Sequence, residues 1–353
     1  MSRNNRQDLL IEIKELEDRI AQTILPPDLK ERISASIERL KLALHFENYS
    51  KNYDEISRYI DWVCSLPWTK KTVDILDLGY AKKILNENHY GLDQIKERIL
   101  EYLAVLKLQT ERQEEKKVRA PILCFVGLVG TGKTTLAYSI AQALGRKFSR
   151  IPFGGLGDPA FLRGRSRMLS ESEPGQIIKA LRYAGSRNPV ILLDEIDRVA
   201  DEARSTIMGV LVELLDPQQN DKFVDYYVDY PFDLSEVLFV ATANNTTNIS
   251  TAVLDRLEPM QMPSYSDAEK ITIGKNYLLP RTMQAMGLTG SDLEISASIW
   301  PKIVRPLGFD AGVRTLERNV AEICRKVAKM IVEGKRGKVI IDENNLGEFI
   351  QSW

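Results

Sequence analysis

The chain has 353 residues, of which 44% are hydrophobic and 27% are charged, as in ordinary globular proteins. This length predicts two or three domains, and a formal net charge of -1 argues against general binding to nucleic acid. The polar N-terminus excludes a typical signal peptide, and every apolar run is too short to span a membrane. The three cysteines form no CxxC pair, which favours free thiols and a cytoplasmic location over a disulfide framework.

Apolar residues recur at helical spacing in three stretches near the N-terminus, over residues 9–20, 29–44 and 56–63. This spacing predicts three amphipathic helices. Because Pro26 and Pro27 interrupt the pattern, a small helical bundle is favoured over one long coiled coil.

The character of the sequence then changes to short apolar runs separated by helical patterns. Runs rich in β-branched residues occupy Ile122–Val126, Val190–Leu193 and Val237–Ala241, and helical patterns occupy 136–144 and 177–184. Short buried strands that alternate with helices predict an α/β fold with a parallel sheet covered on both faces.

Helical spacing returns after Asp267, and Lys338–Asp342 could add one short strand. We therefore expect three parts: a helical region over 1–70, an α/β domain over 71–264 and a helical domain over 265–353.

The segment GLVGTGKTT follows the first predicted strand and precedes a predicted helix, which is the context of a phosphate-binding loop. Glycines allow backbone N–H groups to turn toward phosphate oxygens, and the helix N-terminus adds positive potential. Lys133 would neutralise the β- and γ-phosphates of ATP, and Thr134 would bind Mg²⁺. A chance glycine-rich turn is the alternative, which the flanking strand and helix disfavour. The candidate nucleotide-binding residues here are Gly127, Gly130, Thr131, Gly132, Lys133, Thr134 and Thr135.

Two carboxylates follow the next apolar run in VILLDEID. Asp194, at the end of a buried strand, would hold Mg²⁺, and Glu195 would act as general base toward the attacking water. The alternative is that these acids only cap the following helix.

Further segments resemble the AAA+ ATPases: FVATANN (Phe239–Asn245), VLDRLE (Val253–Glu258) and GVRTLER (Gly312–Arg318). The segments HYGLD, LDPQQN and PFDLS narrow the resemblance to the Lon protease family, over nearly the whole chain. The resemblance implies an ATP-hydrolysing module that uses ATP and Mg²⁺, in which residues 265–353 form the helical lid.

The resemblance also implies roles for single residues. Asn244 matches the sensor-1 asparagine, with Asn245 as a less favoured alternative, and Arg314 matches the sensor-2 arginine of the lid. Arg256 matches an arginine finger that acts in the neighbouring subunit's site, which implies a homo-oligomeric ring, a hexamer by family analogy. Surface or lid ion pairs are the alternative roles for both arginines. The segment that matches the adenine pocket contains His89, Tyr90, Gly91 and Leu92.

The loop that grips substrates in Lon-type rings departs from the family pattern. That loop carries an aromatic–aliphatic pair, but the corresponding residues here are Met168, Leu169 and Ser170, with Leu169 in place of the aromatic residue. A leucine wedges against a threaded polypeptide less well than an aromatic ring. Phe161 could compensate, although its flanking residues favour a role in the core or at a helix start.

We therefore expect an ATPase that unfolds and translocates protein substrates for degradation. No segment resembles the peptidase domain of Lon, so this chain is not expected to cut peptide bonds itself, and a separate or downstream peptidase is the expected partner. The alternative is a nucleotide-responsive scaffold or regulator that threads substrates weakly or not at all. A DNA-remodelling motor is disfavoured because no basic face is apparent.

Overall fold

The computed structural model describes residues 3–43, 49–112, 122–169, 171–305, 312–335 and 337–350. The predicted positions Leu44 and Ser170 lie outside these ranges. The chain forms two compact units, which are described separately. The first unit comprises Met1–Asp74, Gly145–Val240 and Ile249–Leu257. The second unit comprises Ile75–Leu144, Ala241–Asn248 and Glu258–Trp353.

The first unit begins with three helices that pack on one another, α1 (Arg3–Gln22), α2 (Pro27–Ala43) and α3 (Tyr49–Ser65). The apolar positions of the predicted stripes are buried between them: Ile13, Leu16, Ile20, Leu29, Ile33, Ile37, Leu40, Ile60 and Val63. Pro27 starts α2, where its missing N–H removes no helical hydrogen bond. The predicted N-terminal helical region is confirmed.

A five-stranded sheet is the centre of the α/β fold, in the order β2-β3-β6-β1-β7. Its strands are β1 (Ile122–Val126), β2 (Phe148–Pro152), β3 (Val190–Asp194), β6 (Leu238–Ala243) and β7 (Leu257–Gln261). The pairs β2–β3 and β1–β6 are parallel, with Pro152 opposite Asp194 and Val126 opposite Ala243. The predicted α/β class and the three predicted strands are confirmed.

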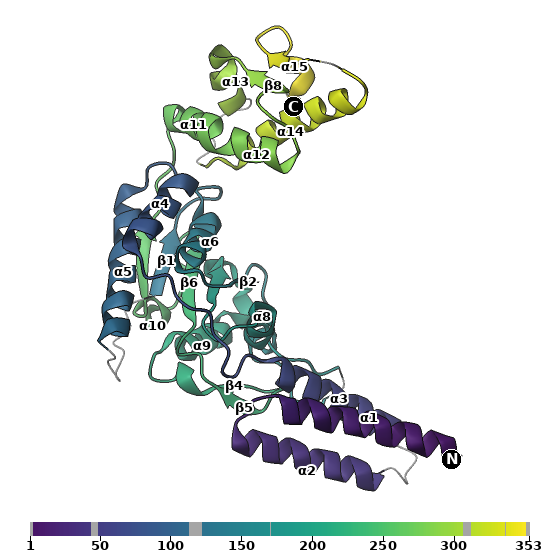
Figure 1. Cartoon of the computed structure of the whole chain (residues 1–353). Helices are drawn as coiled ribbons and strands as arrows, with labels where there is room; N and C mark the ends of the chain where they lie inside the picture. Colours follow the sequence, from purple (N-terminus) through teal and green to yellow (C-terminus); the bar gives the residue numbers. More distant parts are fainter. Residues whose placement is uncertain are drawn as a thin grey trace. The chain divides into compact units, whose positions relative to one another are not determined.

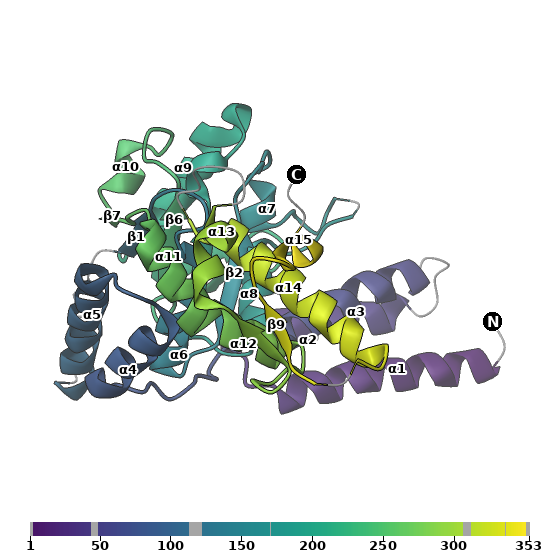
Figure 2. The same cartoon turned by 90° about the horizontal axis from the view of Figure 1, so that it is seen from above.

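Each unit also contains helices. In the second unit α4 (Leu78–Asn88) contacts both α5 (Asp93–Glu111) and α6 (Lys133–Leu144), and the three lie side by side in both views (Figure 1, Figure 2). In the first unit α8 (Gln176–Ala184) packs against β2. The helices predicted over 136–144 and 177–184 are therefore present as α6 and α8.

The first unit contains shorter elements that carry the loops. Its other helices are α7 (Ala160–Arg163), α9 (Arg204–Leu215) and α10 (Thr251–Leu254), and its 3₁₀ turns are Ile196–Arg198, Asp201–Ala203 and Asn220–Lys222. An antiparallel hairpin joins β4 (Phe223–Asp225) to β5 (Tyr230–Phe232).

The second unit ends in a helical region with its own core. Its elements are α11 (Asp267–Ile273), a π-helical turn (Gly274–Leu278), α12 (Leu279–Ala285), β8 (Leu293–Ile295), a 3₁₀ turn (Ala297–Ile299), α13 (Trp300–Val304), α14 (Arg314–Val332), β9 (Val339–Ile341) and α15 (Leu346–Phe349). One face of α14 buries Leu316, Val320, Ile323 and Val327 around Trp300. β9 confirms the predicted strand and pairs in parallel with β8, which the sequence did not indicate. None of the described helices is long and apolar enough to cross a membrane.

Candidate functional site

The predicted phosphate-binding loop joins the end of β1 to the start of α6. Gly130 and Gly132 have φ angles of 82° and 95°, in the left-handed region that glycine adopts without strain. The side chains of Thr131 and Thr135 are turned back onto loop carbonyl groups, with hydrogen bonds of 2.9 Å to Leu128 and Gly132 respectively. The loop is therefore built from glycine geometry and short-range hydrogen bonds.

Lys133 is 8% exposed and lies within this loop. Its Nζ donates to the carbonyl oxygens of Gly127 and Leu128 at 2.5 and 3.0 Å, and to Asn244 Oδ1 at 3.2 Å. Asn244 Nδ2 is buried and has no hydrogen-bond partner among the described residues. A buried donor without a partner is costly, so an ammonium and an amide N–H gathered at one loop fit an anionic ligand.

The two candidate sensor-1 asparagines differ in their surroundings. Asn244 faces Lys133, whereas Asn245 Oδ1 accepts a hydrogen bond of 3.0 Å from the backbone N–H of Thr247. The geometry favours Asn244 as the residue that faces the phosphate-binding loop.

Residues at the start of α14 lie directly against the phosphate-binding loop. Val313 N donates to Gly130 O at 3.0 Å, and a Cβ placed on Gly312 would be 2.4 Å from the carbonyl carbon of Gly130. Arg314 follows at once, and its Cβ would be 3.2 Å from a Cβ placed on Gly130. The sequence motif indicated Arg314 but not the glycine-on-glycine contact that brings this arginine to the loop.

The predicted adenine segment forms the turn between α4 and α5. Gly91 and Leu92 both have positive φ angles, of 60° and 58°. Tyr90 packs against the helical core of the second unit and lies edge-on to Tyr277, with ring centroids 6.3 Å apart. Tyr90 therefore packs on the same core that one face of α14, the helix that begins at Arg314, helps to form.

His89, which precedes this turn, is held by two buried hydrogen bonds. Its Nε2 lies 2.9 Å from Ser139 Oγ on α6, and its carbonyl oxygen accepts from Lys96 Nζ at 2.7 Å. Burial, aided by the charge of Lys96, lowers the pKa of His89 to about 4, so the imidazole is neutral at pH 7. The role of Lys96 was missed because a lysine on a charged helix gives no local signal.

In the first unit, Asp194 closes the buried strand β3. Its side chain is buried, and Arg150 on β2 donates to Oδ2 from Nε and Nη2 at 2.6 Å each. Two donors on one carboxylate oxygen orient the Asp194 side chain, as a carboxylate that binds hydrated Mg²⁺ must be oriented. Arg150 was not identified from the sequence because β2 itself was not.

Glu195 has a φ angle of 59°, an uncommon conformation for a residue with a side chain. Its carboxylate lies 3.7 Å from Arg198, and a Cβ on Gly154 would be 3.2 Å from Glu195 Oε2. The side chain does not cap the 3₁₀ turn that begins at Ile196, which argues against the capping alternative for this residue.

Arg256 is engaged within its own chain. It donates to Asp216 Oδ2 at 2.8 Å and to Ala252 O at 2.7 Å, and the hydrogen bond from Arg256 lowers the pKa of Asp216. This contact is the ion pair that was the alternative role expected for Arg256. Its partner, Asp216, belongs to the segment LDPQQN. Donation to a neighbouring subunit stays a proposal.

The loop that follows α7 exposes its tip. Met168 is 97% and Leu169 is 58% exposed. The Arg165 N–H donates to Glu173 O at 3.0 Å at the base of this loop, and the guanidinium of Arg167 lies 3.7 Å from the centroid of the Tyr59 ring. The loop is thus anchored at its base while Met168 and Leu169 face outward.

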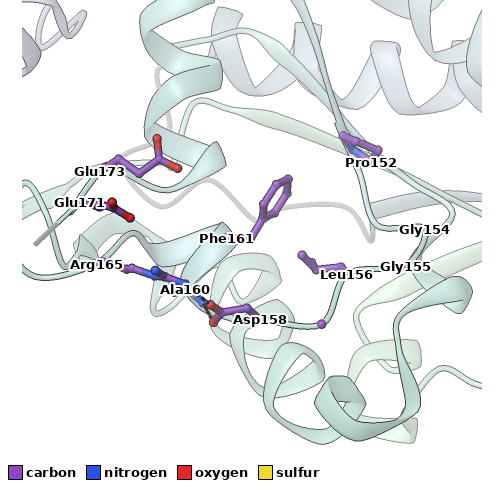
Figure 3. Close-up of a pocket in the computed structure, with 11 residues that line it drawn as sticks. Pro152, Gly154, Gly155, Leu156, Asp158, Ala160, Phe161, Arg165, Glu171 and Glu173 are labelled. Atoms are coloured by element: carbon purple, nitrogen blue, oxygen red, sulfur yellow. Dashed lines mark hydrogen bonds and ion pairs between the residues drawn. The ribbon is translucent and has the colours of Figure 1, made fainter. Parts of the chain in front are cut away.

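Phe161 lies where one of its two expected roles, at a helix start, places it. It is the second residue of α7, as a helix-start role predicts, but it is not a core residue. Its ring projects into a pocket of about 730 Å³ in the first unit, whose lining also includes the glycines at positions 154, 155 and 157 and the side chain of Leu156 (Figure 3).

Two family models match the chain. The model of the ATPase family associated with various cellular activities (AAA) matches residues 123–264, and that of the Lon protease AAA+ ATPase lid domain matches residues 284–340. Together these ranges include the phosphate-binding loop, both acids, Asn244, Arg256 and Arg314.

Curated relatives match nearly the whole chain. The Lon protease of Dictyoglomus thermophilum is 45% identical over 341 residues, which is 96% of this chain and 42% of the relative. The Lon protease of Lawsonia intracellularis is 43% identical over 339 residues, covering 96% and 40%, and that of Heliobacterium modesticaldum is 41% identical over 345 residues, covering 98% and 41%. The chain therefore spans about two fifths of the length of these relatives. The chain belongs to the Lon protease family, of which it carries the AAA ATPase and lid segments.

Proposed function

We propose that this chain is an ATP-hydrolysing motor module that acts on protein substrates. The observation that carries the proposal is the arrangement around Lys133, in which a buried ammonium lies beside Asn244, whose buried amide N–H has no partner within the described part of the chain. A triphosphate would supply the negative charge and the acceptors that suit these donors.

Each part of the nucleotide has candidate partners. Lys133 and the loop N–H groups would hold the phosphates, and Tyr90, Gly91 and Leu92 would contact the adenine. Thr134 and Asp194 would hold Mg²⁺, which when bound neutralises phosphate charge. The Arg150–Asp194 ion pair supports this because it holds the Asp194 carboxyl group in one orientation.

We propose the domain limits 1–70, 71–264 and 265–353 for the helical region, the nucleotide-binding domain and the lid.

The hydrolytic step needs a positioned water and charge stabilisation. Glu195 would accept the proton of the water, and Asn244 would orient that water. Arg314 from the lid and Arg256 from an adjoining copy would stabilise the charge that develops in the transition state. The site would then be complete only in a homo-oligomeric ring, for which a hexamer is proposed.

In such a ring, nucleotide cycling would move the exposed Met168–Leu169 tip against a polypeptide in the cytoplasm and pass it to a separate or downstream peptidase. The 97% exposure of Met168 supports contact with a substrate. The alternative, a nucleotide-responsive scaffold or regulator, is favoured by the leucine at position 169. An assay that follows unfolding of a tagged, labile fluorescent protein separates the two, because a scaffold leaves the fluorescence unchanged in the presence of ATP.

The Glu195→Gln variant tests the catalytic assignment. Removal of a general base should lower the ATP hydrolysis rate by about 10²–10⁴-fold while ATP binding is kept, because the phosphate-binding loop is unchanged. Phosphate release measures turnover, and a fluorescent ATP analogue measures binding. Glu202→Gln, at an exposed position outside the site, serves as the matched control. Full turnover in Glu195→Gln would remove Glu195 from the mechanism.

A further inference from the structure

The pocket beside Phe161 has no role in nucleotide chemistry as proposed above. It lies wholly within the first unit, between the segment that follows β2 and the loop that bears Met168 and Leu169. Its volume of about 730 Å³ exceeds what a single ion needs and is ample for a long side chain. Figure 3 shows the Phe161 ring in the middle of the hollow, with Leu156 and Pro152 on one side and the two glutamates on the other.

The charged lining of the pocket is mostly negative. Of its four charged side chains, three are the acids Asp158, Glu171 and Glu173, and Arg165 is the only base. Arg165 is already paired with Asp158 at 2.8 Å, and this partner lowers the pKa of Asp158. The charges of Arg165 and Asp158 largely cancel each other. The exposed Glu171 and Glu173 therefore make the electrostatic potential of the pocket negative. Lys179 offsets part of it by pairing with Glu173 at 2.8 Å.

The apolar lining complements this charge. An aromatic face attracts a cation that lies within about 6 Å of the ring centroid, and it also covers the methylene groups of a long basic side chain. Leu156 forms part of the same wall. Outside the pocket, the exposed Met168 and Leu169 offer apolar contacts to the residues next to a side chain that enters.

We propose that this pocket binds a lysine or arginine side chain of an extended polypeptide, and that it selects basic residues flanked by apolar ones. The cation would lie over the Phe161 ring and against Glu171, and the flanking apolar residues would contact Met168 and Leu169. An inorganic cation has no methylene groups to pack on the Phe161 ring and the apolar wall. The inference rests on the proposed function, because it names the class of substrate segment that the motor engages.

The test uses the full chain without nucleotide and a short fluorescein-labelled peptide with one Leu-Lys-Leu cluster in a Gly-Ser background. Fluorescence anisotropy measures its dissociation constant. The same peptide with N-acetyl-lysine keeps the shape and removes the charge, and we expect it to bind at least about fivefold more weakly. Glu171→Gln should weaken binding of the lysine peptide by a similar factor, and Phe161→Leu should also weaken it.

The combination of changes gives the sharpest result. If Glu171 recognises the lysine, acetylation should cause little further loss in Glu171→Gln, whereas the full loss should persist in the control Glu202→Gln. An acetylation effect that is undiminished in both Glu171→Gln and Phe161→Leu would overturn the proposal, as would equal binding of the two peptides by the unaltered chain. Because the Glu171 side chain is exposed, the Glu171→Gln variant should fold like the unaltered chain.

Failure of this inference is distinguishable from failure of the proposed function. Peptide binding is measured without ATP, and ATP hydrolysis is measured without peptide. A chain that hydrolyses ATP but does not distinguish the two peptides disproves only the basic-residue pocket. A chain that distinguishes them without hydrolysing ATP disproves only the motor.

Discussion

At the scale of the residue, the buried histidine beside the phosphate-binding loop makes the protein sensitive to acid. The pKa of His89 is about 4 in the folded chain against an ordinary 6.5. Between these values the unfolded chain binds a proton that the folded chain does not, so most of the loss of stability occurs as pH drops from about 6.5 toward 4, and little is lost above about pH 7.5. The loss between pH 7.5 and pH 5 should be about 2 kcal/mol.

Urea unfolding of the unaltered chain and of His89→Gln at pH 7.5 and pH 5 measures this difference, because only the unaltered chain carries the titrating group. The chain has two histidines, so proton NMR resolves two imidazole signals, and the variant assigns the signal of His89. A midpoint near 6.5 for that signal, or an identical pH dependence in the two proteins, would contradict the prediction.

The site residues that could be predicted from the sequence belong to contiguous motifs, whereas those that were missed have partners far away in the sequence. The phosphate-binding loop and the Asp194–Glu195 pair are contiguous motifs, so their presence could be predicted. Arg150 lies 44 residues from its partner, and only the pairing of two strands brings them together. The contact of Gly312 with Gly130 spans a still larger separation. Such contacts depend on tertiary packing, for which single-sequence patterns carry no signal.

At the scale of the element, burial decided which strands could be predicted. β3 and β6 are buried along their whole length and read as continuous apolar runs. The two edge strands, β2 and β7, mix buried residues with partly or fully exposed ones and include Arg150, Pro152 and Pro259, so no apolar run marks them.

The contact between α14 and the phosphate-binding loop predicts that Gly312→Ala impairs nucleotide binding. The added methyl group would be 2.5 Å from Val129 O and 2.4 Å from the carbonyl carbon of Gly130, both backbone atoms that cannot rotate away. Overpacking of this kind costs about 1–3 kcal/mol, so the affinity for a fluorescent ATP analogue should fall by about tenfold or more.

Gly209→Ala is the matched control, because Gly209 lies within α9 and a Cβ there meets nothing within 4 Å. Alanine should stabilise that helix by about 0.5–1 kcal/mol without changing nucleotide affinity. Equal affinities in the two variants would show that α14 can move off the loop at no cost, and the role proposed for Arg314 would then lose its structural support.

At the scale of the whole molecule, the proposed site combines one chain's loop and acids with an arginine of another copy. Within the chain, Arg256 is paired with Asp216. Its proposed role therefore requires that Arg256 contact the nucleotide of an adjoining copy, either after leaving Asp216 or while still paired with it. The ion pair places Arg256 at a defined position on the surface, 27% exposed, from which a neighbouring site could be reached.

Mixing of two inactive variants tests this arrangement. Lys133→Ala chains lack the phosphate contact but keep Arg256, and Arg256→Ala chains keep the phosphate-binding loop and the acids. In mixed rings, an Arg256→Ala chain next to a Lys133→Ala chain would form a complete site, so equal mixing should restore ATP hydrolysis at about a quarter of the sites. Lys133→Ala mixed with Glu195→Gln should restore none, because both defects lie in the part of the site that one chain supplies. Mixed rings verified by mass spectrometry that show no recovery in the first mixture would place Arg256 in its own chain's ion pair alone.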